Sequence, residues 1–211
     1  MQRFPDRREA GRMLARTLLR RDYADAIVVG LPRGGVPVAA EVADALSAPL
    51  DVLVVRKLGV PGHEEVAMGA VGENGTAVIN QDVVTMARVP ASALDAARRR
   101  ESVEVERRVE MFREGRAALE LGGRTVIVVD DGLATGATAR AGCTIARARG
   151  AAEVVLAIPV AAPDALARVA EADEVVCVWT PPGFMAVGMH YVDFSPVEDE
   201  EVVALLRAET G

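Results

Sequence analysis

Two adjacent carboxylates, Asp130 and Asp131, follow an apolar run and precede a string of small and hydroxyl-bearing residues in the stretch VIVVDDGLATGAT. Adjacent carboxylates repel each other and gain nothing inside a helix or a sheet. A ligand outside the chain therefore explains them better than the fold does. Carboxylates only accept hydrogen bonds, which suits them to sugar hydroxyls or, through water, to a divalent cation.

The residues that follow the two acids are suited to holding a phosphate. They are small or carry a hydroxyl, and they lead into a helix expected over residues 138–149. The free amides and the positive dipole end at the start of a helix attract anions, and threonine hydroxyls add further donors. The expected phosphate-binding residues are Ala134, Thr135, Gly136, Ala137 and Thr138.

A second segment with suitable chemistry is LPRGG, residues 31–35. Arg33 supplies a bidentate donor for an anion, and Gly34 and Gly35 let backbone amides approach a ligand. The plain alternative is that Arg33 only caps a turn.

The third segment is RKLGVPGHEE, residues 56–65. Two adjacent cations, Arg56 and Lys57, open it. Residues 57–66 are expected to form a loop that closes over a bound ligand as a lid. The plain alternative is that Lys57 is an ordinary surface cation.

The elements around these segments alternate along the chain. Short apolar runs predict buried strands, and helical spacing of apolar residues predicts helices between them. Such alternation predicts a parallel sheet with helices on both faces. Buried strands are expected at residues 26–30, 51–55, 125–130, 153–160 and 174–180, and helices at 6–20, 36–48, 138–149 and 163–172. Residues 67–71 and 76–80 are expected to form a hairpin or two short strands.

This alternation brings the three segments together. Open parallel sheets bind ligands beyond the carboxyl ends of their strands. LPRGG, RKLGVPGHEE and the paired acids each follow a predicted strand. One ligand satisfies all three: a ribose that carries one phosphate, with a second phosphate group lying across the site.

A long, highly charged helix is expected over residues 92–120, with one apolar stripe along it. The arginines at 98–100 are a phosphate or partner site in one interpretation and part of a solvated helix face in the other. We expect this insertion to pack on the flank of the domain or to build a subunit interface. The stripe consists of Val105, Val109, Phe112 and Leu119.

Aromatic side chains gather near the C-terminus, between residues 179 and 194. In one interpretation Trp179 or Phe184 stacks on a flat base, as part of a hood over the site. In the other, the aromatic residues form a small cluster, with His190 packed in it, that anchors the C-terminal helix. That helix is expected to begin at Ser195 as its N-cap.

The whole-chain numbers frame these expectations. With 211 residues the chain is long enough for one domain, and its net charge of −7 argues against a protein that coats nucleic acid. Cys143 and Cys177 lack metal-ligand spacing and are expected to be reduced thiols. No apolar run reaches membrane-spanning length and no signal peptide is recognisable, so we expect a cytoplasmic protein without a membrane partner.

VIVVDDGLATGAT resembles the motif by which type I phosphoribosyltransferases bind 5-phosphoribosyl 1-diphosphate (PRPP). That motif has four apolar residues, two acids and a Thr-Gly-x-Thr-like turn. LPRGG resembles the pyrophosphate loop of the family, and VVRKLGVPG resembles the start of its mobile catalytic loop. The stretch VGMHYVDFSPVEDEEV is similar to the C-terminal part of bacterial phosphoribosyltransferase-like proteins of unsettled substrate.

The resemblance implies an α/β fold: a Rossmann-like parallel sheet flanked by helices, in a single domain over residues 1–211. Its core would cover residues 25–160, with a helical insertion at 83–121 and a small C-terminal hood at 175–211. It also implies an activity, the transfer of a 5-phosphoribosyl group from PRPP to a nitrogenous base, with purines as a candidate class, and with release of pyrophosphate. Mg²⁺ and a homodimer are expected with it. The alternative is a non-catalytic protein of the same fold that binds PRPP or a nucleotide and regulates a partner.

The resemblance also implies roles for single residues. Asp130 and Asp131 would hold the ribose 2′- and 3′-hydroxyls and would meet Mg²⁺ only through water or PRPP. The residues from Ala134 to Thr138 would hold the 5′-phosphate. Lys57, Arg33 and Asp131 would be the catalytic residues, and the pyrophosphate contacts would come from Arg33, Gly34, Gly35 and Lys57.

The chain departs from the family pattern at two positions. Gly132 stands where the motif usually has a branched apolar residue, which loosens the turn. Ala134 stands where several purine-salvage enzymes have an acid that acts on the incoming base. Any general base must then come from another loop. The candidates are Glu64, Glu65 and His63, and Glu64 is the one that we count among the expected catalytic residues.

Overall fold

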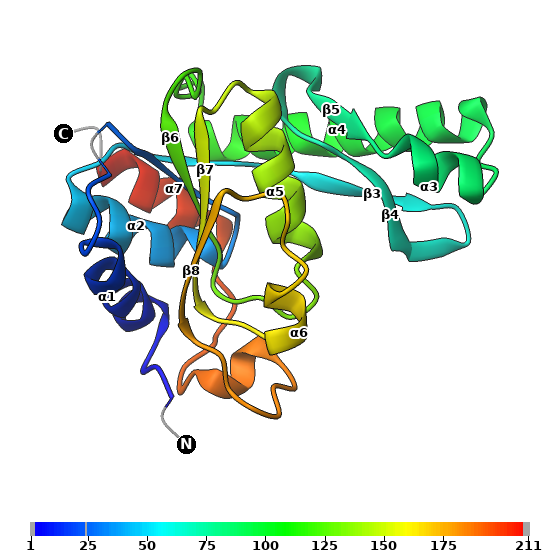
Figure 1. Ribbon diagram of the computed structural model, residues 1–211. Helices are drawn as coiled ribbons and strands as arrows, with labels where there is room; N and C mark the ends of the chain where they lie inside the picture. Colours follow the sequence, from blue (N-terminus) through cyan, green and yellow to red (C-terminus); the bar gives the residue numbers. More distant parts are fainter. Residues whose placement is uncertain (1–2, 24, 209–211) are drawn as a thin grey trace.

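The computed structural model describes residues 3–23 and 25–208, and its centre is a five-stranded parallel sheet (Figure 1). Its strand order is β2-β1-β6-β7-β8, and each neighbouring pair is parallel. These strands are short runs of Val, Ile and Leu, as strands covered on both faces require. They are β1 (Ile27–Gly30), β2 (Leu50–Val52), β6 (Thr125–Val129), β7 (Glu153–Val160) and β8 (Glu174–Trp179).

Helices cover both faces of this sheet, which confirms the predicted fold class. Along β6, Ile127 and Val129 belong to one buried cluster, whereas Val126 and Val128 belong to the other. Successive side chains of a strand point to opposite faces, so one strand serves two cores. The first face carries α1 (Arg7–Leu18), α2 (Gly35–Leu46) and α7 (Asp199–Ala208), and the second carries α5 (Ala137–Ala148) and α6 (Pro163–Leu166).

A second, antiparallel sheet extends away from the parallel one, on the right of Figure 1. We call residues 56–113 the arm. Its chain order contains three strands, one 3-10 turn and two helices: β3 (Arg56–Val60), β4 (His63–Val71), η1 (Glu73–Gly75), β5 (Ala77–Ile79), α3 (Gln81–Met86) and α4 (Ala91–Arg113).

The arm corrects the prediction of a loop at residues 57–66. Residues 56–60 and 63–71 pair as a hairpin that turns at Pro61 and Gly62, where Gly62 has a φ of +79°. Leu58 and Val60 are buried, so the segment alternates as a strand does. Gly59 and Pro61 hide this alternation in the sequence.

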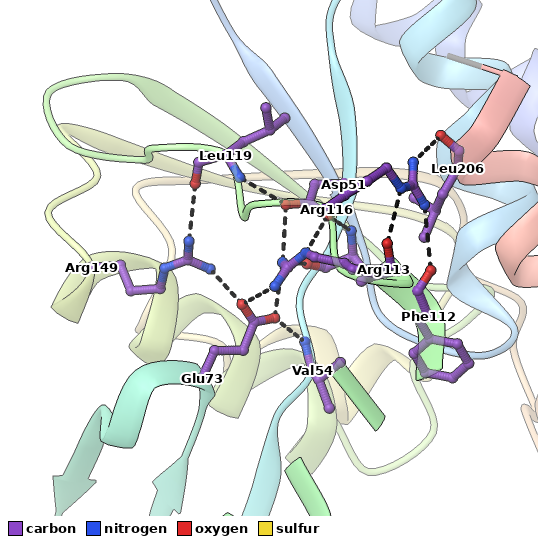
Figure 2. A network of polar contacts seen from close by, with 10 residues as sticks. Asp51, Val54, Glu73, Phe112, Arg113, Arg116, Leu119, Arg149 and Leu206 are labelled. Carbon is purple, nitrogen blue, oxygen red and sulfur yellow. Dashed lines mark hydrogen bonds and ion pairs between the residues drawn. The ribbon is translucent and has the colours of Figure 1, made fainter. Parts of the chain in front are cut away.

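A buried ionic network attaches the arm to the core (Figure 2). Arg113, at the end of α4, donates two hydrogen bonds to Asp51 of β2, both at 2.9 Å. It also donates to Glu73 of η1 at 2.6 Å, and Arg149 approaches the same carboxylate at 3.4 Å. Glu73 is only 1% exposed. Charges this deeply buried need such partners, so the network fixes where the arm leaves the core.

Three helix predictions need correction. The helix expected at 163–172 is the four-residue α6, and the long charged helix ends at Arg113, so Leu119 lies beyond it. The C-terminal helix begins at Asp199 and not after Ser195. Ser195 is engaged otherwise, because its hydroxyl and its amide both donate to the carboxylate of Asp193, at 2.6 and 2.9 Å.

Both cysteines are free thiols, as expected: Cys143 is buried and Cys177 is half-buried. Burial raises the pKa of Cys143 to about 12, which keeps this thiol protonated and unreactive. Among the residues that the structure describes, no helix is both long and apolar enough to cross a membrane.

Candidate active site

The LPRGG segment packs directly on the paired acids at the carboxyl ends of β1 and β6. A β-carbon on Gly34 would lie 2.1 Å from Oδ2 of Asp131, and one on Gly35 would lie 2.5 Å from the carbonyl oxygen of Val129. No side chain fits at either position. The two glycines are therefore needed for the contact between these loops, a reason different from the approach of ligand to amide that the sequence suggested.

The surroundings of the two acids disfavour the ionised form of both carboxyl groups. Oδ1 of Asp130 accepts a hydrogen bond from the amide of Asp131 at 2.9 Å. Burial raises the pKa of Asp130 well above its usual range, and the neighbouring charge of Asp131 raises it further. Burial also raises the pKa of Asp131, and Arg7 opposes this shift. Ligand hydroxyls or a cation at this place would replace the hydration that these carboxylates have lost.

Arg7, at the start of α1, is the cation that the sequence prediction missed. Its Nε donates to Oδ2 of Asp131 at 2.9 Å. No local pattern separates this arginine from Arg8, its neighbour on the same helix. Arg7 is brought to the acids by the packing of α1 on α2 and of the N-terminal segment against the C-terminal one.

The predicted phosphate-binding residues form the start of α5. Gly136 precedes the helix with a φ of +80°, a conformation that favours glycine. Thr135 and Thr138 are exposed, and the Thr135 hydroxyl accepts a hydrogen bond from the amide of Ala137 at 3.4 Å. The segment from Ala134 to Thr138 is thus an open turn at a helix N-terminus, as an anion cradle requires.

A cavity of about 680 Å³ lies between the arm and α5 and brings Lys57 together with this turn. Its lining includes Lys57 on β3 and both Thr135 and Ala137 at the start of α5. The adjacent cation, Arg56, pairs instead with Glu101 of α4 at 2.9 Å. Neighbouring side chains on a strand point to opposite sides, so Lys57 lines the cavity whereas Arg56 contacts α4.

Arg33 is exposed and lies beside the start of α7. Its Nη1 is 3.7 Å from Asp199 and 3.9 Å from Glu198, which are loose ion pairs. The peptide between Pro32 and Arg33 is cis. No pattern in the sequence indicates that the C-terminal helix presents acids to this loop.

The candidates for a general base lie on the hairpin of the arm. His63 and Glu64 are exposed at the start of β4. Glu64 folds back on the hairpin, since a β-carbon on Gly59 would lie 2.5 Å from its Oε2. Neither is among the described residues that line the cavity beside Lys57. The side chain of Glu65 lies outside the described part of the structure.

Trp179 and Phe184 both pack on His190. The Trp179 ring meets the imidazole edge-on at 5.0 Å between centroids, and the Phe184 ring stacks on it at 5.1 Å. These residues join a buried cluster with Phe4 and Tyr191. The arrangement favours the interpretation of an anchoring cluster, and stacking of Trp179 or Phe184 on a base stays a prediction.

The structure also gives a reason for Gly132. A β-carbon there would lie 2.5 Å from Val187, a residue of η2 (Val187–His190) in the C-terminal segment. The space that a branched residue fills in the usual motif is thus occupied from another part of the chain, so the turn is packed and not loosened.

Comparison with known proteins places this geometry in a family. Residues 5–182 match the family model described as the phosphoribosyl transferase domain. A Mycobacterium tuberculosis protein, provisionally named as a phosphoribosyl transferase in two strains, is 55% identical over 207 residues, which cover 98% of this chain and 47% of that protein. The chain therefore spans about half the length of the curated relatives it matches.

Solved structures share the fold. A protein from Thermus thermophilus has a TM-score of 0.93 at 43% identity, and the match covers 100% of both chains. A hypothetical protein from Neisseria gonorrhoeae with bound ppGpp has a TM-score of 0.51 at 16% identity, covering 96% of this chain and 92% of that one. The family model covers most of the sequence: the chain belongs to the phosphoribosyl transferase domain family.

Proposed function

We propose that this protein transfers a 5-phosphoribosyl group from PRPP to a nitrogenous base, with release of pyrophosphate. The observation that carries the proposal is the convergence of three segments at one edge of the sheet. LPRGG lies on the paired acids, the open turn before α5 follows them, and Lys57 shares a cavity with that turn. The chain is proposed to act as one domain over residues 1–211, with the core, insertion and hood boundaries that the sequence suggested.

The ligand groups are assigned by chemistry. The ribose hydroxyls go to Asp130 and Asp131, because carboxylates accept hydrogen bonds from them. The 5′-phosphate goes to the turn from Ala134 to Thr138, which lies at the N-terminus of α5 and has both threonines exposed. The pyrophosphate goes to LPRGG and Lys57, with Arg33 as its bidentate donor.

The donor set fits Mg²⁺ in an indirect way. Asp130 and Asp131 offer hard oxygen ligands, which Mg²⁺ prefers. The described residues contain no group of three or more His, Cys, Asp or Glu side chains that could form a metal cage. The fit is therefore to an ion held mainly by diphosphate and ribose oxygens, with the two acids acting through water. When bound, Mg²⁺ supplies positive charge to the departing diphosphate.

The protein's own side chains would stabilise the charges that develop on the sugar and on the leaving group. Cleavage of the bond between C1′ and the pyrophosphate leaves positive charge on the sugar and negative charge on the leaving group. Asp131 and Asp130 hold the sugar in place, while Arg33 and Lys57 stabilise the diphosphate. Preorganised charges of this kind usually make the largest contribution to catalysis. Glu64 is the proposed general base, reaching the acceptor when the hairpin of the arm closes over the site and excludes water.

The acceptor is proposed to be a nitrogenous base, with purines as the first class to test, and Trp179 or Phe184 as the stacking residues. We further propose a cytoplasmic homodimer that binds neither nucleic acid nor membrane. The alternative function is binding of PRPP or a nucleotide without turnover, as a regulator of a partner.

One assay separates the two functions. The protein is incubated with PRPP, Mg²⁺ and a panel of purines, pyrimidines and related amines, and pyrophosphate release is measured. Release with a particular acceptor, lost in Asp131→Asn and kept in the surface variant Arg107→Gln, supports transfer. Tight PRPP binding without release on any acceptor supports the regulator. Absence of PRPP binding contradicts transfer and leaves only a regulator that binds a nucleotide.

A further inference from the structure

We propose that Arg7 is a positioning residue for the phosphoribosyl site: it holds one carboxylate oxygen of Asp131 so that the other faces the ribose. The inference rests on the proposed assignment of the ribose to the paired acids. It adds a residue outside the segments that carry the family motifs.

The first step is the geometry of the Asp131 carboxylate. Its Oδ2 accepts a hydrogen bond from Nε of Arg7 at 2.9 Å, and both side chains are largely buried, at 12% and 16% exposure. The same oxygen lies against Gly34, where a β-carbon would come within 2.1 Å of it. Arginine on one side and the LPRGG loop on the other therefore enclose Oδ2. Oδ1 is the oxygen left for a ribose hydroxyl.

The second step is that Arg7 is itself fixed. Its guanidinium carbon lies 3.9 Å from the centre of the Phe194 ring, and its Nη1 donates to the carbonyl oxygen of Ser195 at 2.8 Å. A planar guanidinium can stack on a ring and donate along two edges at once, which an ammonium cannot do. Each of these contacts restricts the direction in which Nε points.

The third step is that an N-terminal segment and a C-terminal segment meet at Asp131. The Tyr191 hydroxyl donates to the carbonyl oxygen of Asp131 at 2.6 Å. The amide of Phe4 donates to the carbonyl of His190 at 2.9 Å, and the amide of Val192 donates to the carbonyl of Phe4 at 2.8 Å. The N-terminal segment and the C-terminal segment thus form one joint, and this joint delivers Arg7 and Tyr191 to the same residue.

The contact between Arg7 and Asp131 also has an electrostatic effect on the paired acids. Asp130 and Asp131 are adjacent, so their carboxylates repel each other and each would tend to rotate away. A cation held beside Asp131 offsets this repulsion and selects one orientation. A site that must meet two neighbouring hydroxyls gains affinity when its acceptors are already oriented before binding.

The test compares ligands that differ in single hydroxyls. Binding of ribose 5-phosphate, 2-deoxyribose 5-phosphate and 3-deoxyribose 5-phosphate is measured by calorimetry for the wild type, Arg7→Met and Arg8→Met. Arg8 is the matched control, since it lies on the same helix and pairs with Glu41 at the surface, 49% exposed. We expect Arg7→Met to weaken ribose 5-phosphate binding about 10- to 100-fold, as loss of an orienting partner typically does.

The deoxy ligands make this test specific. The weakening by Arg7→Met should fall below about threefold for the ligand that lacks the hydroxyl held by Asp131. Equal weakening for all three ligands would overturn the inference, because it would reveal a general structural effect. Unchanged binding of ribose 5-phosphate in Arg7→Met would also overturn it. A wild type that does not distinguish the three ligands would instead refute the ribose assignment and the proposed function with it.

Two further variants guard against a simple loss of folding. Arg7→Lys keeps the charge but cannot make all the contacts, so its hydroxyl-dependent affinity should lie between those of the wild type and Arg7→Met. Phe194→Leu removes only the stacking ring and should lower the affinity for ribose 5-phosphate in the same hydroxyl-dependent way. A Phe194→Leu protein that is folded by circular dichroism and binds all three ligands as the wild type does would contradict the proposal.

Discussion

Gly34 and Asp131 lie so close together that a β-carbon on the glycine would be 2.1 Å from a carboxylate oxygen of the aspartate. They come from loops about a hundred residues apart in the sequence that follow two paired strands, β1 and β6. The loop proposed to bind pyrophosphate and the acids proposed to bind ribose are therefore one packed unit. A change in one loop must move the other.

The first prediction follows from this contact. Gly34→Ala should lower the affinity for PRPP at least about tenfold, because the new methyl group pushes Asp131 out of position. Overpacking should also lower the free energy of unfolding by about 1–3 kcal/mol. Calorimetry with PRPP and urea unfolding measure the two effects. Gly122→Ala is the control, since a β-carbon there has no heavy atom within 4 Å; equal losses in both variants would show that the contact is unimportant.

The second prediction concerns the raised pKa of Asp130. An acid whose pKa is higher in the folded than in the unfolded state binds more protons when folded, so its ionisation lowers the free energy of unfolding as pH rises. This penalty begins above the unfolded pKa, about 3.9, and is complete above the folded one. The substitution Asp130→Asn removes this ionisation penalty, and the side-chain amide oxygen can still accept the hydrogen bond from the Asp131 amide.

The Asp130→Asn protein should therefore be more stable than the wild type near pH 7 without ligand, and equally stable at about pH 3, below the unfolded pKa. We expect Tm to rise by about 2–4 °C near neutrality, which corresponds to about 1 kcal/mol for a chain of this size. PRPP should no longer raise Tm. Thermal unfolding at several pH values measures this, and a neutral-pH Tm at or below that of the wild type would contradict the proposed electrostatic cost.

The parallel core and the paired acids were predictable because their signals are local. A run of Val and Ile predicts a buried strand, and the acids and glycines after VIVV mark its carboxyl end wherever the strand lies. The same holds for α5, whose start is marked by Gly136 and the threonines around it. Such patterns need no knowledge of distant parts of the chain.

The rest depends on tertiary contacts that no local pattern encodes. Arg7 reaches Asp131 because α1 packs on α2 and because Phe4 pairs with Tyr191 across most of the chain length. The hairpin of the arm escaped prediction because Gly59 and Pro61 interrupt its alternation. Ser195 resembles an N-cap in the sequence, but its hydroxyl donates a hydrogen bond to the side chain of Asp193 instead of capping a helix.

The third prediction concerns the network that attaches the arm. Arg113→Met leaves Asp51 and Glu73 buried without their shared cation, and a broken buried ion pair typically costs about 3–5 kcal/mol. Urea unfolding should show a loss of this size. Arg107→Gln, which breaks an exposed pair with Glu104 on the same helix, should cost less than about 1 kcal/mol. Similar losses in both variants would mean that the buried network does not hold the arm.

The last prediction separates the two adjacent cations of the arm. Lys57 lines the cavity beside the phosphate-binding turn, whereas Arg56 pairs with Glu101 of α4. If Lys57 stabilises the departing pyrophosphate, Lys57→Met should lower kcat by about 10²- to 10³-fold, the usual cost of removing a charge-stabilising donor. Arg56→Met removes the same charge one residue away and should lower stability while kcat changes less than about threefold. Steady-state pyrophosphate release with saturating PRPP and acceptor measures both variants. An equal fall in kcat in the two would show that the arm contributes only its overall charge, and an unchanged kcat in Lys57→Met would remove this lysine from the mechanism.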